Sequence, residues 1–119
     1  DLRQEVARRY GELLAGVVAT PVIPGGCKSV WAQYSVLASD SAQRAAFMAK
    51  LKGEGVPTAI YYPKPLHLQR AFTDAGYRKG DFPIAENCAG RIFSLPMHPY
   101  LAEKDQRRIA TSLRGEAGQ

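Results

Sequence analysis

A chain of 119 residues with 45% hydrophobic and 23% charged residues is typical of one globular domain with a single core. The net charge is +5, but the basic residues are scattered in runs no longer than a pair, which argues against a nucleic-acid-binding stripe. The longest apolar stretch, residues 13–26, is broken by Pro21 and Pro24, and therefore lacks the roughly 20 continuous apolar residues of a membrane helix.

The first predicted element is an amphipathic helix over residues 2–15. Apolar residues recur there at near-helical spacing, and charged residues occupy the other side. Gly16 is expected to end this helix. Asp1 is both the first residue and the sole side chain available to cap it, which indicates a chain that begins inside a domain or a longer protein. The N-terminus has no leader-like pattern and the two cysteines make no disulfide framework, so we expect a cytoplasmic protein.

A strand and a helix are predicted next. Residues 29–37 are β-branched, aromatic and roughly alternating, which predicts a strand. Residues 41–52 predict a helix, because Asp40 and Gln43 resemble a capping box and the alanines that follow share one helical face.

The second half of the chain predicts shorter elements. Residues 58–62 predict a strand that the following prolines end, since proline cannot donate to a central ladder. Residues 66–81 predict a loop with one helical turn, residues 82–88 a short helix, and residues 91–95 a third strand. A final amphipathic helix follows, with an acidic residue near its start and arginines toward its end, as the helix dipole favours.

This order of elements predicts an α+β fold. We expect a small antiparallel or mixed sheet of about three strands, with helices packed on one face. The sequence contains no internal repeat and no low-complexity segment.

The densest set of functional side chains lies at residues 61–69, just past a predicted strand end, where binding sites collect. Alternation places Tyr61 and Tyr62 on opposite faces, so at most one of them serves the core. One core tyrosine and one ordinary surface tyrosine would give the same pattern. His67 can donate a hydrogen bond to a phosphate or a sugar hydroxyl, but with no nearby carboxylate to set its tautomer the pattern alone favours a structural role.

Three further patterns resemble ligand sites and lack what such sites require. Lys64 lies between two prolines and is expected to point into solvent, unlike a Schiff-base lysine. No metal site is expected, because none of the candidate ligands falls within a short metal-binding spacing: Cys27, His67, Cys88 and His98. Gly25 and Gly26 precede Lys28 as in a phosphate loop, but the glycine spacing is absent and they predict a turn.

Five short motifs follow one another along the chain. They are Ser-Val-Trp-Ala-Gln-Tyr at 29–34, Gly-Val-Pro-Thr-Ala-Ile-Tyr-Tyr-Pro at 55–63, Pro-Leu-His at 65–67, Phe-Pro with Ala-Glu at 82–86, and Ser-Leu-Pro-Met-His-Pro at 94–99. In this order and at this spacing they resemble the C-terminal small domain of the DegT/StrS-type sugar aminotransferases. The resemblance covers nearly the whole chain.

The resemblance implies a fold-type-I enzyme that moves an amino group, usually from glutamate, to a keto group of a nucleotide-linked sugar. In such enzymes the Schiff-base lysine and the other residues that hold the cofactor belong to a large N-terminal domain with no counterpart here. It therefore implies pyridoxal 5'-phosphate in the full-length enzyme, none bound to this chain, and no catalytic residue or activity in the isolated chain. Residues 1–119 would be the small domain, and residues 1–15 the end of the helix that joins the two domains.

The resemblance also implies partners and contacts. The expected partners are the missing large domain, the nucleotide-sugar substrate and a second subunit in a homodimer. The family closes an aromatic-or-His, Tyr, Pro motif over the sugar nucleotide, which carries over to Tyr61 and Tyr62 as substrate-binding residues, with His67 nearby. Phenols and imidazole suit hydroxyls and pyrophosphate oxygens. A histidine often stands in the family where Tyr61 stands here, and which of the two tyrosines faces the ligand stays open.

Two alternatives from other classes remain. One is a free-standing small-ligand-binding or regulatory α+β module without enzyme activity. The other is a basic nucleic-acid-binding fold, which needs Lys28, Lys64 and Arg70 to converge on one face. If the aminotransferase interpretation holds, the face that packs against the large domain should expose an apolar patch.

Overall fold

The computed structural model describes residues 1–117, with side chains to residue 115. Its elements in chain order are α1 (Leu2–Leu13), β1 (Tyr34–Leu37), α2 (Ser41–Gly53), the 3-10 helices η1 (Leu66–Leu68) and η2 (Arg70–Ala75), α3 (Pro83–Arg91), β2 (Ile92–Leu95) and α4 (Glu103–Ala117). The α+β class is confirmed. None of the helices in residues 1–117 is both long enough and apolar enough to cross a membrane.

The sheet has two strands, where the sequence predicts about three. β1 and β2 pair antiparallel, with Tyr34 opposite Leu95 and Val36 opposite Phe93. The expected strand at 58–62 contributes a single bridge, in which Ala59 exchanges both backbone hydrogen bonds with Ser94, at 3.2 and 2.8 Å. Prolines bound this segment closely and cannot donate to a ladder, so its pairing with β2 stops at one residue.

The expected strand at 29–37 is also shorter, because the chain turns at Trp31. This residue has a φ of 54°, in the left-handed region that bulky residues rarely adopt. Its backbone amide donates to Ser29 Oγ, and its carbonyl oxygen accepts a hydrogen bond from Arg3 Nη1 of α1 at 2.8 Å. The indole Nε1 donates to Gln4 Oε1 at 3.1 Å. These contacts hold Trp31 out of the extended conformation, and β1 begins three residues later.

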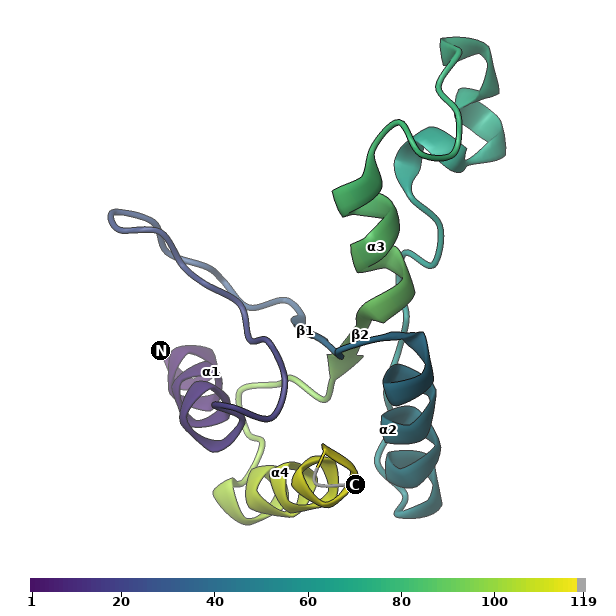
Figure 1. Cartoon of the computed structure of the whole chain (residues 1–119). Helices are drawn as coiled ribbons and strands as arrows, with labels where there is room; N and C mark the ends of the chain where they lie inside the picture. The colour runs from purple at the N-terminus through teal and green to yellow at the C-terminus, as the bar shows by residue number, and fades with distance from the viewer. Residues whose placement is uncertain (118–119) are drawn as a thin grey trace.

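Helices cover one face of the sheet, as predicted (Figure 1). Tyr10 of α1 stacks on Tyr34 with ring centroids 4.8 Å apart, and Phe47 of α2 contacts Phe93 of β2 at 5.9 Å. α4 packs against both α1 and α2. On the other face Ser35 and Ser94 share a hydrogen bond of 2.7 Å. The hydrophobic core therefore lies between the sheet and these helices.

The helices follow the sequence pattern closely. Asp40 caps α2 by accepting a hydrogen bond from the Gln43 amide at 2.7 Å, and the Gln43 side chain accepts one from the Ser39 amide. α1 ends at Leu13, and Gly16 follows it in the left-handed conformation at φ 77°. The predicted helices at 2–15 and 41–52 are thus confirmed to within two residues.

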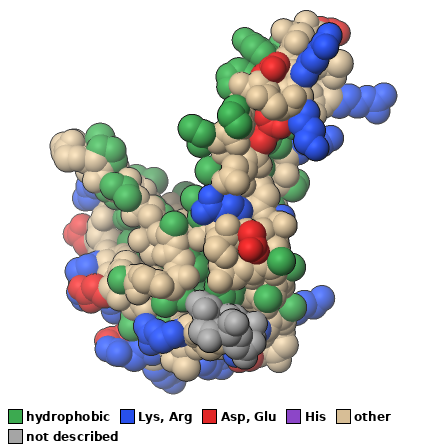
Figure 2. Space-filling view, in the orientation of Figure 1, with side chains coloured by type: hydrophobic (Ala, Val, Ile, Leu, Met, Phe, Trp, Pro, Cys, Tyr) green, Lys and Arg blue, Asp and Glu red, His purple; other side chains and the backbone are tan. Residues whose placement is uncertain are grey.

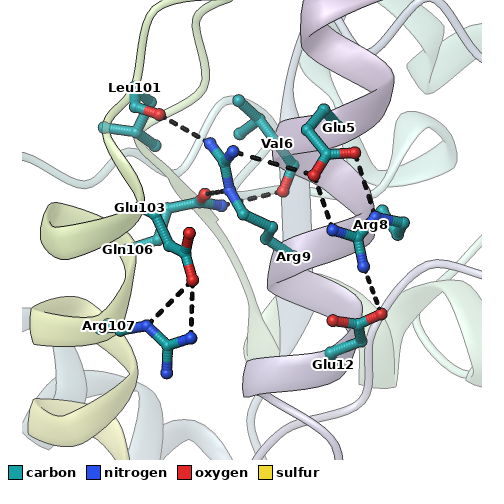
Figure 3. A network of polar contacts seen from close by, with 9 residues as sticks. All are labelled: Glu5, Val6, Arg8, Arg9, Glu12, Leu101, Glu103, Gln106 and Arg107. Atoms are coloured by element: carbon teal, nitrogen blue, oxygen red, sulfur yellow. Dashed lines mark hydrogen bonds and ion pairs between the residues drawn. The ribbon is translucent and has the colours of Figure 1, made fainter.

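A polar cluster joins the two ends of the chain, where α1 packs on α4 (Figure 3). Gln106 of α4 is fully buried; its Nε2 donates to the Val6 carbonyl at 2.8 Å and its Oε1 accepts from Arg9 Nε. Arg9 Nη2 also donates to the Leu101 carbonyl at 2.8 Å. Because each of these buried polar groups has a partner, the cluster fixes the register of α1 against α4.

One segment projects from the rest of the molecule, and we call residues 61–86 the arm (Figure 1). It contains η1, η2 and the first turn of α3. α3 then runs into β2 without a loop. At this joint Arg91 Nε donates to the Ala38 carbonyl at 2.7 Å, and Arg44 of α2 donates to the carbonyls of Ala89 and Ile92. We call the remainder, with its helices and sheet, the body.

Candidate functional site

Tyr61 and Tyr62 lie at the base of the arm, and both are exposed. Their exposed fractions are 54% and 71%, so neither belongs to the core. Both line a small pocket of about 40 Å³ on the sheet face opposite the helices, together with Gln33, Ser35 and Ser94. Tyr61 also lines a neighbouring pocket of about 160 Å³. The structure therefore places the two phenols beside the polar side chains of Gln33, Ser35 and Ser94.

His67 lies in η1, away from these polar side chains. Only 9% of it is exposed, and it lines a different pocket, of about 320 Å³, within the arm. This pocket is mainly apolar, and its other lining residues are Leu66, Phe72, Ala75, Tyr77, Phe82 and Ala85. The three predicted substrate-binding residues thus divide between two pockets.

Three rings form the wall of the arm pocket. His67 meets Phe82 edge-on with ring centroids 4.8 Å apart, and Tyr77 meets the same phenyl ring at 5.0 Å. Such edge-to-face contacts are favourable ring geometries. Figure 2 shows hydrophobic side chains gathered along the side of the arm. The pocket is consequently a largely apolar hollow with an imidazole and a phenol among its lining groups.

Glu86 supplies the carboxylate that the sequence pattern does not reveal next to His67. Its Oε2 lies 3.3 Å from His67 Nε2, and the two side chains are only 15% and 7% exposed. The same carboxylate accepts hydrogen bonds from the Gly80 amide, at 2.8 and 2.9 Å, and from the Phe82 amide at 3.3 Å. The expectation that His67 has no carboxylate partner is wrong, because the partner comes from a helix 19 residues further along the chain.

The hydrogen bonds to Glu86 favour its ionised form. They hold its pKa below the ordinary value; the Gly80 amide contributes most, and the Phe82 amide and His67 also contribute. A carboxylate bound in this way is fixed in position. Sequence reasoning did not single out Glu86, although the motif at 82–86 includes it.

None of the lysines of this chain is buried. A Schiff-base lysine needs a desolvated pocket that lowers the pKa of its amine. Every lysine in the chain is exposed or half-buried, and Lys64 is exposed as predicted. The lysines of this chain therefore do not show the buried setting that a Schiff-base lysine requires.

The remaining patterns behave as ordinary structure. The predicted turn at Gly25 and Gly26 is confirmed: the Cys27 amide donates to the Pro24 carbonyl at 3.1 Å and Gly26 has a φ of 82°. Cys27 is exposed and Cys88 half-buried, and both are free thiols. Within residues 1–117, no group of three or more His, Cys, Asp or Glu side chains is placed to hold a metal ion.

Comparisons with known proteins agree with the arrangement of these elements. The chain is 41% identical over 113 residues to the UDP-2-acetamido-2-deoxy-3-oxo-D-glucuronate aminotransferase of Pseudomonas aeruginosa, covering 94% of this chain and 30% of that protein. It is 38% identical over 115 residues to the UDP-N-acetyl-3-dehydro-alpha-D-glucosamine 3-aminotransferase of Acidithiobacillus ferrooxidans, covering 96% and 30%. A crystal structure of a DegT DnrJ EryC1 StrS aminotransferase from Brucella abortus superimposes with a TM-score of 0.87 at 46% identity, covering 99% and 31%.

The chain thus spans about 30% of the length of the curated relatives that it matches. A family model describing the DegT/DnrJ/EryC1/StrS aminotransferase family matches residues 1–114, nearly the whole chain. The resemblance drawn from the five motifs is confirmed. This chain belongs to the DegT/DnrJ/EryC1/StrS aminotransferase family.

Proposed function

We propose that this chain is the C-terminal small domain of a pyridoxal-phosphate-dependent aminotransferase, which closes over a nucleotide-linked sugar while glutamate supplies the amino group. The observation that carries the proposal is the family match over residues 1–114, made by a chain that spans about 30% of its relatives. In this proposal α1 is the end of the helix that joins the two domains. The isolated chain then recognises substrate and has no turnover of its own.

The names of two relatives suggest the substrate class. One acts on a UDP-linked 2-acetamido-2-deoxy-3-oxo sugar and the other on a UDP-linked N-acetyl-3-dehydro sugar. Both names describe a 3-keto group on an N-acetylated sugar carried by UDP. We therefore propose a sugar of this class as the first substrate to test.

The two exposed tyrosines suit a role in closing over such a ligand. Phenols both donate and accept hydrogen bonds, as sugar hydroxyls and pyrophosphate oxygens require. Tyr61 and Tyr62 project from the base of the arm, where no core contact occupies them. A large domain facing this side would enclose the ligand between the two domains and exclude water from it.

Exposed apolar side chains support a missing partner for this chain. Those of the arm are Leu66, Phe72, Tyr77, Phe82 and Ile84, and a second group comprises Leu2, Val22, Ile23 and Val30. Apolar groups gathered on a monomer surface commonly mark an interface. We assign them to contacts with the large domain and with the second subunit of a homodimer.

A fusion enzyme tests the proposal. The segment of the P. aeruginosa relative that aligns with this chain is replaced by this chain, and transamination of that relative's UDP-sugar by glutamate is measured. The fusion should bind pyridoxal phosphate, as its absorbance reports, and turn over, whereas the isolated chain should do neither. Cofactor binding or turnover by the isolated chain would contradict the proposal.

Substitutions in the fusion test the tyrosines. Tyr61→Phe and Tyr62→Phe remove one hydroxyl each, and loss of a ligand hydrogen bond should raise the KM for the UDP-sugar by roughly 3- to 10-fold. Tyr100→Phe, an equally conservative change at another exposed tyrosine, should leave KM unchanged and is the matched control. A fusion that folds and binds the cofactor without turnover would favour a binding or regulatory module. An unchanged KM in both variants would remove the tyrosines from the substrate site.

A further inference from the structure

The imidazole of His67 is held on two sides. Its ring meets the edge of Phe82, and its Nε2 lies 3.3 Å from Glu86 Oε2. Both partners belong to the short segment that begins α3, while His67 belongs to η1. The ring therefore has little freedom to rotate, and its two nitrogens face different surroundings.

The environment of Glu86 decides which ring nitrogen carries the proton. The carboxylate is fixed by the Gly80 and Phe82 amides, so it faces His67 in one orientation. An ionised carboxylate only accepts hydrogen bonds. The nitrogen that faces it, Nε2, must therefore be the donor, and Nδ1 is the acceptor in the neutral ring.

Nδ1 retains contact with solvent. No hydrogen bond of the described residues uses this atom, yet in that part of the chain every fully buried side-chain nitrogen or oxygen has a partner. Nδ1 is consequently not fully buried. His67 lines the arm pocket, where Tyr77 is the other lining side chain with a polar group.

We infer that Glu86 is a positioning residue that holds His67 as the Nε2–H tautomer, so that Nδ1 is presented to the arm pocket as a hydrogen-bond acceptor. A ligand group bound at Nδ1 of the neutral ring is then a donor, a hydroxyl or an N–H, and not a phosphate oxygen. This narrows the earlier expectation, in which His67 suits either a sugar hydroxyl or a pyrophosphate oxygen. The statement about the ligand rests on the proposed function, whereas the statement about the tautomer does not.

Nitrogen NMR of the chain at pH 8 tests the tautomer directly. Wild-type His67 should show an unprotonated Nδ1 and a protonated Nε2 whose hydrogen exchanges slowly with solvent. Glu86→Leu removes the acceptor, so the Nε2 hydrogen should lose its slow exchange and a measurable fraction of His67 should become the Nδ1–H form. Glu86→Gln can keep an oxygen at the position of Oε2, the atom that accepts from the Gly80 and Phe82 amides and faces His67 Nε2, and should therefore retain the Nε2–H tautomer. His98, the other histidine, should not change and is the internal control.

Two results would overturn the inference: a wild-type His67 with its proton on Nδ1, or the same tautomer populations and hydrogen exchange in wild type and in a folded Glu86→Leu variant. If Glu86→Leu disorders the arm, the wild-type spectrum still decides, because the slowly exchanging Nε2 hydrogen is observed there. Glu103→Gln, an exposed acidic residue on α4, is the control for loss of one negative charge and should leave His67 unchanged.

Kinetics of the fusion enzyme test the role of the pair. Glu86→Leu and His67→Ala should each raise the KM for the UDP-sugar, by roughly tenfold, with a smaller effect on kcat. If Glu86 acts through His67, the double variant should be no worse than His67→Ala alone. Additive losses would overturn the positioning role. An inactive fusion rejects the proposed function, and the NMR result then stands by itself.

Discussion

The body and the arm are held together by different forces. The body buries an apolar core drawn from both ends of the chain, from Val6 of α1 to Leu113 of α4. No residue of the arm belongs to this core, and within the arm only His67 is buried. Hydrophobic burial therefore fixes the shape of the body, whereas the arm depends on the Glu86 hydrogen bonds and a few ring contacts.

This difference separates stability from recognition. A segment with little buried apolar surface contributes little to global stability, and its exposed groups stay available for a partner. The arm exposes Leu66 and Ile84, which a self-sufficient domain would be expected to cover. The buried core of the body therefore stabilises the fold, whereas the exposed side chains of the arm are available for contact with a partner.

The largest expected loss of stability comes from a substitution in the core of the body, and the same substitution in the arm is its control. Phe47 is fully buried against Phe93, so Phe47→Ala should lower the free energy of unfolding by about 3–5 kcal/mol. Phe72→Ala, the same change at a half-exposed ring of the arm, should cost less than about 1 kcal/mol. Urea unfolding followed by far-UV circular dichroism measures both. Equal losses would mean that the arm belongs to the cooperative unit.

A smaller effect is expected at the polar cluster between α1 and α4. Gln106→Leu keeps the size of the side chain but leaves the Val6 carbonyl and Arg9 Nε without their partner, which should cost about 1–3 kcal/mol. Glu103→Gln, which removes an exposed ion pair with Arg107 on the same helix, should cost about 0–1 kcal/mol. The comparison uses the same urea titration. A neutral Gln106→Leu would show that packing alone sets the register.

The smallest effect is local and depends on pH. Because the folded-state pKa of Glu86 lies below its ordinary value of 4.5, its contribution is present above that value and is lost as the pH falls through the lower, folded-state value. Amide NMR between pH 7 and 3 should show the Gly80 and Phe82 signals changing in the acid range below 4.5 while the body stays folded.

Two controls identify the group responsible. Glu86→Gln should abolish the acid-dependent change at Gly80 and Phe82, because the new amide does not titrate. The Arg78 amide, which donates to Asp81 instead, reports on the neighbouring carboxylate. A change that persists in Glu86→Gln would assign the titration to another residue.

The sequence predicts the elements that local signals determine. The helix at 41–52 could be predicted because its cap, Asp40 with Gln43, lies within the same segment. The strand at 29–37 was predicted too long, because Trp31 is held in a turn by hydrogen bonds to Arg3 and Gln4 of α1. These two residues lie 28 and 27 positions earlier in the chain. Patterns along the chain record such long-range contacts only indirectly.

The same limit applies to the site. Order and spacing of five motifs were enough to identify the family, and Tyr61, Tyr62 and His67 remain the predicted substrate contacts. The pairing of His67 with Glu86 could not be predicted, because η1 and α3 are joined by an irregular segment whose path the sequence does not specify. Two of the five motifs, those at 65–67 and 82–86, meet in this pair.

The loop-free joint between α3 and β2 has a mechanical consequence. Arg91 and Arg44 clamp this joint to the body, so the arm has no flexible hinge on that side. A displacement of the tip of the arm would therefore tilt the sheet and α2 together with it. If the chain closes over a ligand as we propose, the closing motion would then be a rotation of the whole unit rather than the folding of a flap.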